Sequence, residues 1–262
     1  DGTMGLAKIG GVFHTFCWSG SNTSVVTRTT VSGGSIIEDP INVAITGVPA
    51  LEVAQASVCY YDDAGGQLLS FAHQIHTDST SGVSIIRSTD AGLSWSWLGR
   101  IIVPGVGLDN GGSNNNIGSF PPYAVVGDYF YIWHKDQLAG GTVIGLAVSR
   151  ALISEVLAAA ALGTVSVWNK WNGTDWSELG IGGAPVNVGP SNYTYHSHCN
   201  VFTLADTGEL VMLYTADGRP HRVMFSRDGV NWSLSVAAET EHSDKHPYIT
   251  FFSGNESAPD VV

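Results

Sequence analysis

The stretch Ser88-Thr-Asp-Ala-Gly-Leu-Ser-Trp95 decides how this chain folds. Its spacing is typical of a tight turn between two strands, because the Ser88 and Asp90 side chains can bond back to the turn's own amides while Gly92 adopts a positive φ. Trp95 adds a large ring that packs the base of the hairpin. A shortened copy, Ser226-Arg-Asp-Gly-Val-Asn-Trp232, occurs further along the chain. We therefore expect two similar hairpins far apart in the sequence.

Short β-rich runs separated by Gly or Asp turns recur around these hairpins, as in sandwiches, barrels and propellers. They group into a four-strand repeat with a period of roughly 50 residues, long enough for a propeller blade. The expected strands are 3–9, 12–18, 24–31 and 41–46, then 55–61, 68–73, 83–88 and 95–103, then 122–126, 129–134, 143–149 and 165–171, then 199–204, 210–215, 222–226 and 232–236. Both quoted turns join the third and fourth strands of their repeat.

The rest of the chain completes this picture. Helical periodicity is nearly absent; the Ala/Leu-rich run 151–162 predicts one short helix between two strands of the third repeat. A fifth repeat begins at His246 and is either incomplete or closed by the N-terminal segment. The predicted fold is all-β: a five-bladed β-propeller with four-stranded antiparallel blades, forming a single domain over residues 1–262.

Composition excludes several classes of partner. The chain has 11 basic against 23 acidic residues, so we expect no nucleic-acid partner, which would require clustered Lys and Arg. No run of about 18 apolar residues occurs, so we expect no membrane partner. Cys17, Cys59 and Cys199 are far apart and read as small buried hydrophobes. Several Asn-x-Ser/Thr sites and a low Lys content favour a secreted or extracellular protein.

The quoted turn matches the Asp-box pattern S-x-D-x-G-x-[ST]-W at every position, and the chain resembles Asp-box and five-bladed propeller glycoside hydrolases, a group that includes sialidases and arabinanases. This resemblance implies that Asp90 and Asp228 are structural and lie on the face opposite the active site. A sialidase also needs an arginine triad for the substrate carboxylate. Arg87, Arg150 and Arg227 instead lie beside the turns or their equivalents, which argues against sialidase activity.

Strand direction sorts the polar residues by face, because the start of the first strand and the end of the second strand of each blade lie opposite the Asp-box turns. Six of the nine histidines fall on this expected ligand face. Together with possible sugar-stacking aromatics, the predicted substrate-binding residues are His73, His76, His134, His196, His198, His246, Trp18 and Tyr195. A polar carbohydrate pocket at the propeller axis is the prediction that follows.

Glycoside hydrolysis normally requires two carboxyl groups, one as acid and one as base or nucleophile. We predict Asp136 and Asp217 as the working pair, each at the end of a second strand, with Asp1 or Glu52 as a third. Arabinanase-like enzymes place Asp, Asp and Glu at the starts of three successive blades. Only Asp1 matches that pattern here, because Glu52 or Gln55 is ambiguous in the second blade and Ser119 stands where the Glu belongs.

Other readings stay open beside the hydrolase. A non-catalytic glycan-binding propeller would keep the aromatics and histidines and lack the carboxylate pair. A polysaccharide lyase would use a His or Tyr base, and a protein-binding scaffold would use the fold alone. No cofactor is predicted; a single metal ion at the axial histidines, where His196 and His198 form an HxH pair, is the lesser alternative.

Overall fold

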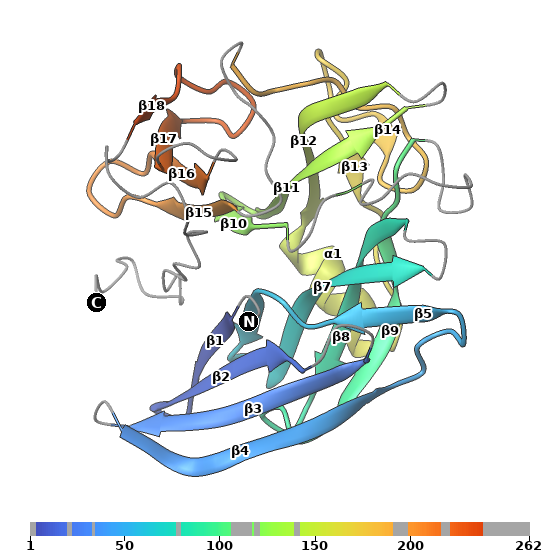
Figure 1. Cartoon of the computed structure of the whole chain (residues 1–262), viewed down its shortest axis with the longest axis vertical. Helices are drawn as coiled ribbons and strands as arrows, with labels where there is room; N and C mark the ends of the chain where they lie inside the picture. Colours follow the sequence, from blue (N-terminus) through green and yellow to red (C-terminus); the bar gives the residue numbers. More distant parts are fainter. Residues whose placement is uncertain are drawn as a thin grey trace.

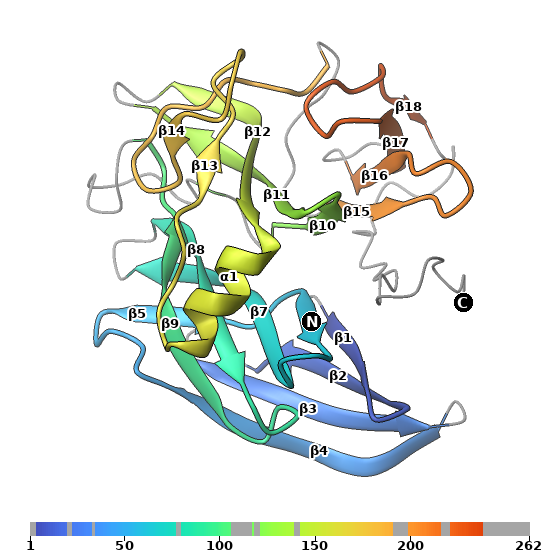
Figure 2. The same cartoon turned by 180° about the vertical axis from the view of Figure 1, so that it is seen from behind.

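The computed structural model describes residues 4–19, 23–32, 35–76, 80–105, 117, 121–138, 142–190, 199–215 and 221–237. This part of the chain is all-β apart from one helix, as the sequence predicted (Figure 1). In these residues no helix is long and apolar enough to span a membrane. Successive groups of strands follow one another around the molecule from β1 to β18 (Figures 1 and 2).

The first group is an antiparallel meander of four strands, and burial alternates along its third strand. Its strands are β1 Met4–Ile9, β2 Val12–Trp18, β3 Val25–Ser32 and β4 Ser35–Thr46. Along β3, Val26, Arg28 and Thr30 are buried while Thr27 and Thr29 between them are only half-buried, which is the period of two that a strand with one covered face requires. The first three predicted strands of this repeat are confirmed to within a residue at each end, whereas the fourth begins at Ser35, six residues before the predicted start at 41.

The second group has an interrupted inner strand. Its strands are β5 Glu52–Gln55, β6 Cys59–Asp62, β7 Gln67–His76, β8 Ser81–Ser88 and β9 Trp95–Ile102. Both β5 and β6 pair with β7, so the single strand predicted over 55–61 is wrong. The break occurs because Ser57 donates its amide to the Ser70 hydroxyl instead of a backbone carbonyl.

The first two groups join into one curled nine-stranded sheet (Figure 1). The join is a short parallel pairing of β4 with β9, in which Ile45 lies opposite Trp95 and Thr46 opposite Ser96. Thr46 Oγ1 also donates to the Trp95 carbonyl at 3.0 Å. The two groups therefore form a half-barrel that is closed along its β4–β9 side. The sequence repeat did not predict this pairing.

Two further antiparallel sheets follow, which we call the third and fourth sheets after their groups of strands. The third contains β10 Tyr123–Val126, β11 Tyr129–Gln137, β12 Val143–Leu152, β13 Asn169–Lys170 and β14 Glu178–Leu179. The fourth contains β15 Cys199–Thr203, β16 Leu210–Thr215, β17 His221–Ser226 and β18 Val236–Ala237. The predicted helix is α1, Ile153–Ala161. The strands predicted over 165–171 and 232–236 are much shorter than expected, because loop segments replace most of each one.

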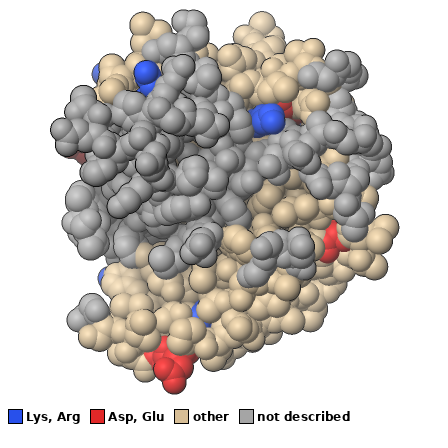
Figure 3. All heavy atoms as spheres, in the orientation of Figure 1, with Lys and Arg blue, Asp and Glu red and all other residues tan. Residues whose placement is uncertain are grey.

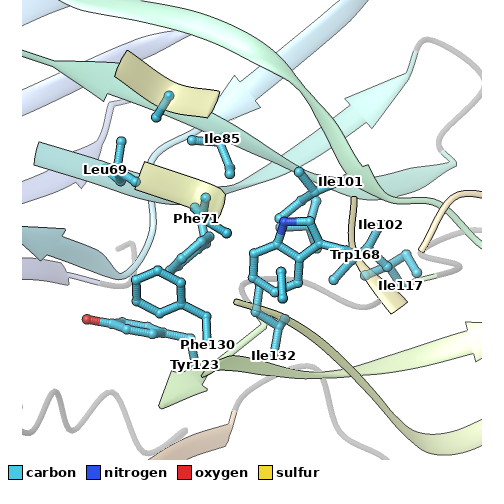
Figure 4. Close-up of a cluster of buried hydrophobic side chains, with 14 residues drawn as sticks. Leu69, Phe71, Ile85, Ile101, Ile102, Ile117, Tyr123, Phe130, Ile132 and Trp168 are labelled. Atoms are coloured by element: carbon cyan, nitrogen blue, oxygen red, sulfur yellow. The ribbon is translucent and has the colours of Figure 1, made fainter. Parts of the chain in front are cut away.

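The buried side chains form three clusters, each shared by neighbouring groups of strands. Phe16, Leu68 and Trp95 belong to the cluster between the first and second groups. Phe71, Phe130 and Trp168 belong to the cluster between the second and third (Figure 4). Trp133 and Met212 belong to the cluster between the third and fourth. Hydrophobic burial therefore holds sheet against sheet around the molecule, which is how stacked propeller blades are stabilised.

Both sequence-predicted turns make the expected hydrogen bonds. Asp90 Oδ1 accepts from the Ser94 amide at 2.8 Å, and the Ser88 hydroxyl accepts from the Gly92 amide at 2.8 Å. Gly92 has a φ of 85° and Trp95 is 1% exposed. In the shorter copy, Asp228 accepts the amides of Val230 and Asn231 at 3.0 and 2.8 Å. The carboxylates of these two turns are occupied by structural bonds.

Candidate functional site

The second group of strands has two distinct edges, which places its polar residues. β7 ends at His76 where β5 begins at Glu52, and these two residues lie opposite each other in the ladder. The Ser88–Trp95 turn lies at the other ends of β8 and β9. We call the end of the strands at Glu52 and His76 the His76 edge, and the opposite end of the strands, at the Ser88–Trp95 turn, the turn edge. The predicted ligand face corresponds to the His76 edge, opposite the turn, as the strand directions require.

Alternation along the strands also gives the sheet an inner and an outer face. Ala54 on β5 and Ala72 on β7 belong to the core shared with Phe16 and Val26 of the first group, so their side faces inward. Residues two apart share a face. His76 on β7 and Glu52 on β5 are therefore inner-face residues near the His76 edge, and both are half-buried.

A bidentate ion pair crosses this inner face. Arg100 on β9 pairs with Glu52 on β5 through two contacts, Nε with Oε2 at 3.2 Å and Nη2 with Oε1. Because the strand order is β9-β8-β7-β5, the Arg100 side chain passes over β8 and β7 to reach the Glu52 carboxylate. The Glu52 side chain is 3% exposed and that of Arg100 is 35% exposed. Arg100 thus forms the solvent side of a neutral, charge-assisted pair.

Trp18 approaches the same region from the first group. It lies opposite Val26 in the β2–β3 ladder, and it is two residues beyond Phe16. Phe16 and Val26 both belong to the core against the second group, so Trp18 lies on the same face at the end of β2. The Ser24 hydroxyl, next to β3, accepts the Ala54 amide at 3.1 Å, which ties the two groups together there. Trp18, Glu52 and His76 are therefore brought to one end of the half-barrel.

His73 lies on the outer face of the same sheet, away from this group. Its Nδ1 is 3.2 Å from Gln55 Oε1, and the residue is 2% exposed. Burial lowers the pKa of His73 to about 4. The imidazole is consequently neutral at physiological pH. His73, which was predicted to bind substrate, is therefore separated from Glu52 and His76 by the thickness of the sheet.

Asp136 lies in a second polar cluster, inside the third sheet. Its Oδ2 pairs with Lys170 Nζ at 2.7 Å, and its Oδ1 accepts the amides of Gly105 and Gln137 at 2.9 and 2.7 Å. Lys170 Nζ also donates to the carbonyls of Val103 and Gly183 at 2.7 and 2.9 Å. Both side chains are fully buried. A direct proton transfer by Asp136 therefore requires this ion pair to open.

His134 lies beside that pair without completing a ligand site. Its Nδ1 is 3.8 Å from Asp136 Oδ2 and 2.8 Å from the Lys135 carbonyl, while its Nε2 is 2.8 Å from the Ser149 hydroxyl. Its pKa is lowered to about 4, mainly by burial; Asp136 opposes the shift and Lys170 adds to it. The ring is a neutral, hydrogen-bonded part of the core.

The other predicted site residues lie outside the described residues: Asp1, Asp217, Tyr195, His196, His198 and His246. Among the described residues, no group of three or more His, Cys, Asp or Glu side chains is arranged to hold a metal ion. On the face seen in Figure 3, the described charged side chains lie in separate places among uncharged described residues.

Two charged residues of these clusters were missed by the sequence reasoning. Arg100 lies within an apolar strand pattern, and no local signal links it to Glu52, 48 residues away. Lys170 lies between an Asn and a Trp in a run that reads as an ordinary outer strand. A charged residue at a strand position that should be buried was the only available hint, and it does not identify the partner.

Comparison with known proteins gives the fold its class. No family model and no curated protein matches the sequence. Among solved structures, a GH43 β-1,3-galactosidase with galactodeoxynojirimycin is similar with a TM-score of 0.55 at 10% identity, over 90% of this chain and 75% of its own. An exo-β-1,3-galactanase from Phanerochaete chrysosporium with galactose gives 0.53 at 11% identity, over 90% and 49%. A Hadza microbial sialidase gives 0.52 at 13% identity, over 88% and 43%.

These likenesses show that the chain has the fold of propeller-type glycoside hydrolases, as its resemblance implied. At these identities the likeness is one of fold. The chain spans three quarters of the galactosidase and less than half of the galactanase and the sialidase. The propeller-type fold is therefore established, and any activity, substrate or reaction has to be argued from the residues.

Proposed function

We propose that this chain is a glycoside hydrolase that acts on a poly- or oligosaccharide in a polar pocket near the centre of the ring of sheets. The observation that carries the proposal is the place of Glu52: a carboxylate at the start of a first strand, on the His76 edge, within a fold shared with glycoside hydrolases over 90% of the chain. The shared fold also supports five blades of four strands, the arrangement that the sequence repeat predicts.

The reaction needs a proton donor for the glycosidic oxygen and a second carboxylate that activates water or attacks the anomeric carbon. Glu52 is the proposed residue for the second role, and its pairing with Arg100, which engages both carboxylate oxygens, has to open for it to act. Asp1 and Asp217, outside the described residues, remain the proposed partners. Asp136 remains a predicted catalytic residue, but its bonds to Lys170, Gly105 and Gln137 favour a positioning role.

A non-catalytic glycan-binding propeller is the second candidate. The observation that favours it is that Asp136, one member of the predicted catalytic pair, has both oxygens occupied inside the protein. Such a protein would bind carbohydrate at the same edge without breaking the glycosidic bond. A lyase with a His or Tyr base would instead leave an unsaturated sugar, which distinguishes it from a hydrolase by the product's ultraviolet absorbance.

The test is a screen against galactans, arabinans, xylans and uronic-acid polysaccharides, with new reducing ends as the readout. We expect Glu52→Gln and Asp217→Asn to abolish the activity found for the wild type. Glu38→Gln is the matched control, because Glu38 also pairs with an arginine, Arg28, whose Nε donates to Ala91 in the turn edge. Full activity in both Glu52→Gln and Asp217→Asn would reject these assignments, and carbohydrate binding without any cleavage would support the second candidate.

A further inference from the structure

Among the described residues, several buried polar side chains lack a hydrogen-bond partner, and Gln74 and Ser84 are two of them that lie on the inner face. Gln74 on β7 is 1% exposed, and neither its amide nitrogen nor its amide oxygen has a hydrogen-bond partner among the described residues. Ser84 on β8 is fully buried, and its hydroxyl is likewise unpartnered in that part of the chain. An unpaired buried polar group costs free energy, so native proteins rarely keep one without a water, an ion or a ligand that uses it.

Both residues lie under the ion pair that crosses the sheet. Gln74 is opposite Ala54 on β5 and Gly82 on β8, and Ser84 is opposite Ala72 on β7 and Arg100 on β9. Opposed residues of an antiparallel ladder share a face, so Gln74 and Ser84 share the inner face with Glu52 and Arg100.

The chemistry of this group selects the ligand class. A carboxamide offers one donor group and one acceptor, and a serine hydroxyl offers both. Two neighbouring hydroxyls of a sugar ring, one accepting and one donating, complement such an amide. The described charges at the site, those of Glu52 and Arg100, already neutralise each other. A neutral sugar therefore suits the group better than an acidic one.

We infer that Gln74 and Ser84 form a hydroxyl-binding subsite for a neutral sugar ring, covered on its solvent side by Arg100 and Glu52. The inference deepens the proposed function and rests on it, since it assigns the same edge of the same sheet to carbohydrate. Trp18 faces this edge from the first group and supplies an aromatic ring for the apolar face of the sugar. Entry requires the partly exposed Arg100 side chain to move aside.

The test measures binding and stability separately. Titrations of methyl β-D-galactopyranoside, methyl β-D-glucopyranoside and methyl β-D-xylopyranoside, followed by NMR, give the affinity, and methyl β-D-glucuronide provides the acidic comparison. In Gln74→Leu we expect the affinity for the best neutral glycoside to fall by about tenfold or more. We expect its melting temperature without ligand to be unchanged or raised, because the leucine removes a polar group that lacks a partner.

Gln67→Leu is the matched control on the same strand. Gln67 is also buried, but its Nε2 donates to Asp62 Oδ2 at 3.1 Å and to the Leu157 carbonyl at 3.2 Å. That variant should lower the melting temperature and leave the affinity unchanged. If Gln74→Leu fails to fold, Ser84→Ala replaces it, with an expected severalfold loss of affinity at an unchanged melting temperature.

The binding and stability results either support or overturn the subsite at Gln74 and Ser84. Weaker sugar binding at preserved stability supports the subsite, even if no substrate is ever cleaved. A wild type that binds no neutral glycoside, or variants that bind as the wild type does, overturns it, even if hydrolysis is found and depends on Glu52. Lower stability of Gln74→Leu with unchanged binding shows instead that a buried water satisfies the amide, and this also overturns the subsite.

Discussion

Lys170 Nζ lies 2.7 Å from Asp136 Oδ2, and neither side chain is exposed to solvent. The ammonium has two further acceptors, the carbonyls of Val103 and Gly183. Val103 follows the last strand of the half-barrel, whereas Asp136 and Lys170 belong to the third sheet. The pair therefore links two neighbouring sheets through a buried charge. Such a link is weak grounds for high stability, but breaking it is costly because one charge stays behind.

Lys170→Met should consequently destabilise the protein by about 3–5 kcal/mol, since it leaves the Asp136 carboxylate buried without its cation. Urea unfolding at neutral pH measures the change. Replacing both residues by apolar ones, as in Asp136→Leu with Lys170→Met, should cost less than Lys170→Met alone. Arg227→Ala serves as the exposed control: its Nε lies 3.6 Å from Glu209 Oε1 and its side chain is 89% exposed. Equal costs for the buried and exposed variants would contradict the role given to Lys170.

Gly92 is the glycine of the Ser88–Trp95 turn, and its replacement should destabilise the protein. Its φ of 85° is unfavourable for other residues, and an added Cβ would collide with the Phe16 ring. Gly66 has a similar φ of 63° but nothing lies near its Cβ position. Gly66→Ala should therefore cost about 1 kcal/mol from backbone strain alone, and Gly92→Ala clearly more. Thermal unfolding of the two variants compares them; a smaller loss in Gly92→Ala would show that Phe16 moves freely.

The strands were predictable because their signals are local. The β-rich run of β3, the turn residues from Ser88 to Trp95 and the Ala/Leu run of α1 each depend on neighbouring residues only. The interruption between β5 and β6 was not predictable, since it results from the bond of Ser57 to Ser70. The pairing of β4 with β9 was missed for the same reason: Ile45 and Trp95 are distant in sequence, and nothing local links them.

The candidate site was predictable only as a set of positions. Strand direction placed Trp18, Glu52 and His76 at one edge, and the register of the strands agrees. It could not show that His73 faces the opposite side of the same strand pair. Nor could it show that Asp136, placed after a shift of register in β11, has Lys170 as a partner 34 residues away. Sequence position gives the edge of the sheet, whereas burial and partners depend on long-range packing.

Replacing Trp18 tests whether the sugar binds at the His76 edge without changing a charged residue. Trp18→Ala should weaken the binding of neutral glycosides about tenfold, because the sugar loses a stacking surface worth about 1–1.5 kcal/mol. NMR titration with methyl β-D-galactopyranoside measures the loss. Trp232→Ala is the control: this half-buried tryptophan packs at 5.8 Å against Trp133 in the core between the third and fourth sheets. It should lose stability and keep its affinity; the reverse pattern would move the ligand away from the His76 edge.

Stability should fall as the pH is lowered from about 6.5 towards 4, because the two most deeply buried of the described histidines, His73 and His134, must stay neutral in the folded state. Burial lowers the pKa of His73 and of His134 to about 4, against 6.5 for an unperturbed imidazole. Between these values the unfolded chain binds more protons than the folded one, so the free energy of unfolding rises with pH. At pH 5 each histidine should cost about 2 kcal/mol relative to pH 7.

Urea unfolding at pH 7 and at pH 5 checks this dependence in the wild type, in His73→Gln and in His134→Gln. Each variant should lose part of the difference between the two pH values, whatever its absolute stability, because glutamine does not titrate. The turn carboxylates Asp90 and Asp228 do not confuse the result: hydrogen bonds from their turns lower their pKa below the usual value of 3.8, so they stay ionised throughout this range. A wild type equally stable at both pH values would show that the two imidazoles reach water in the folded state.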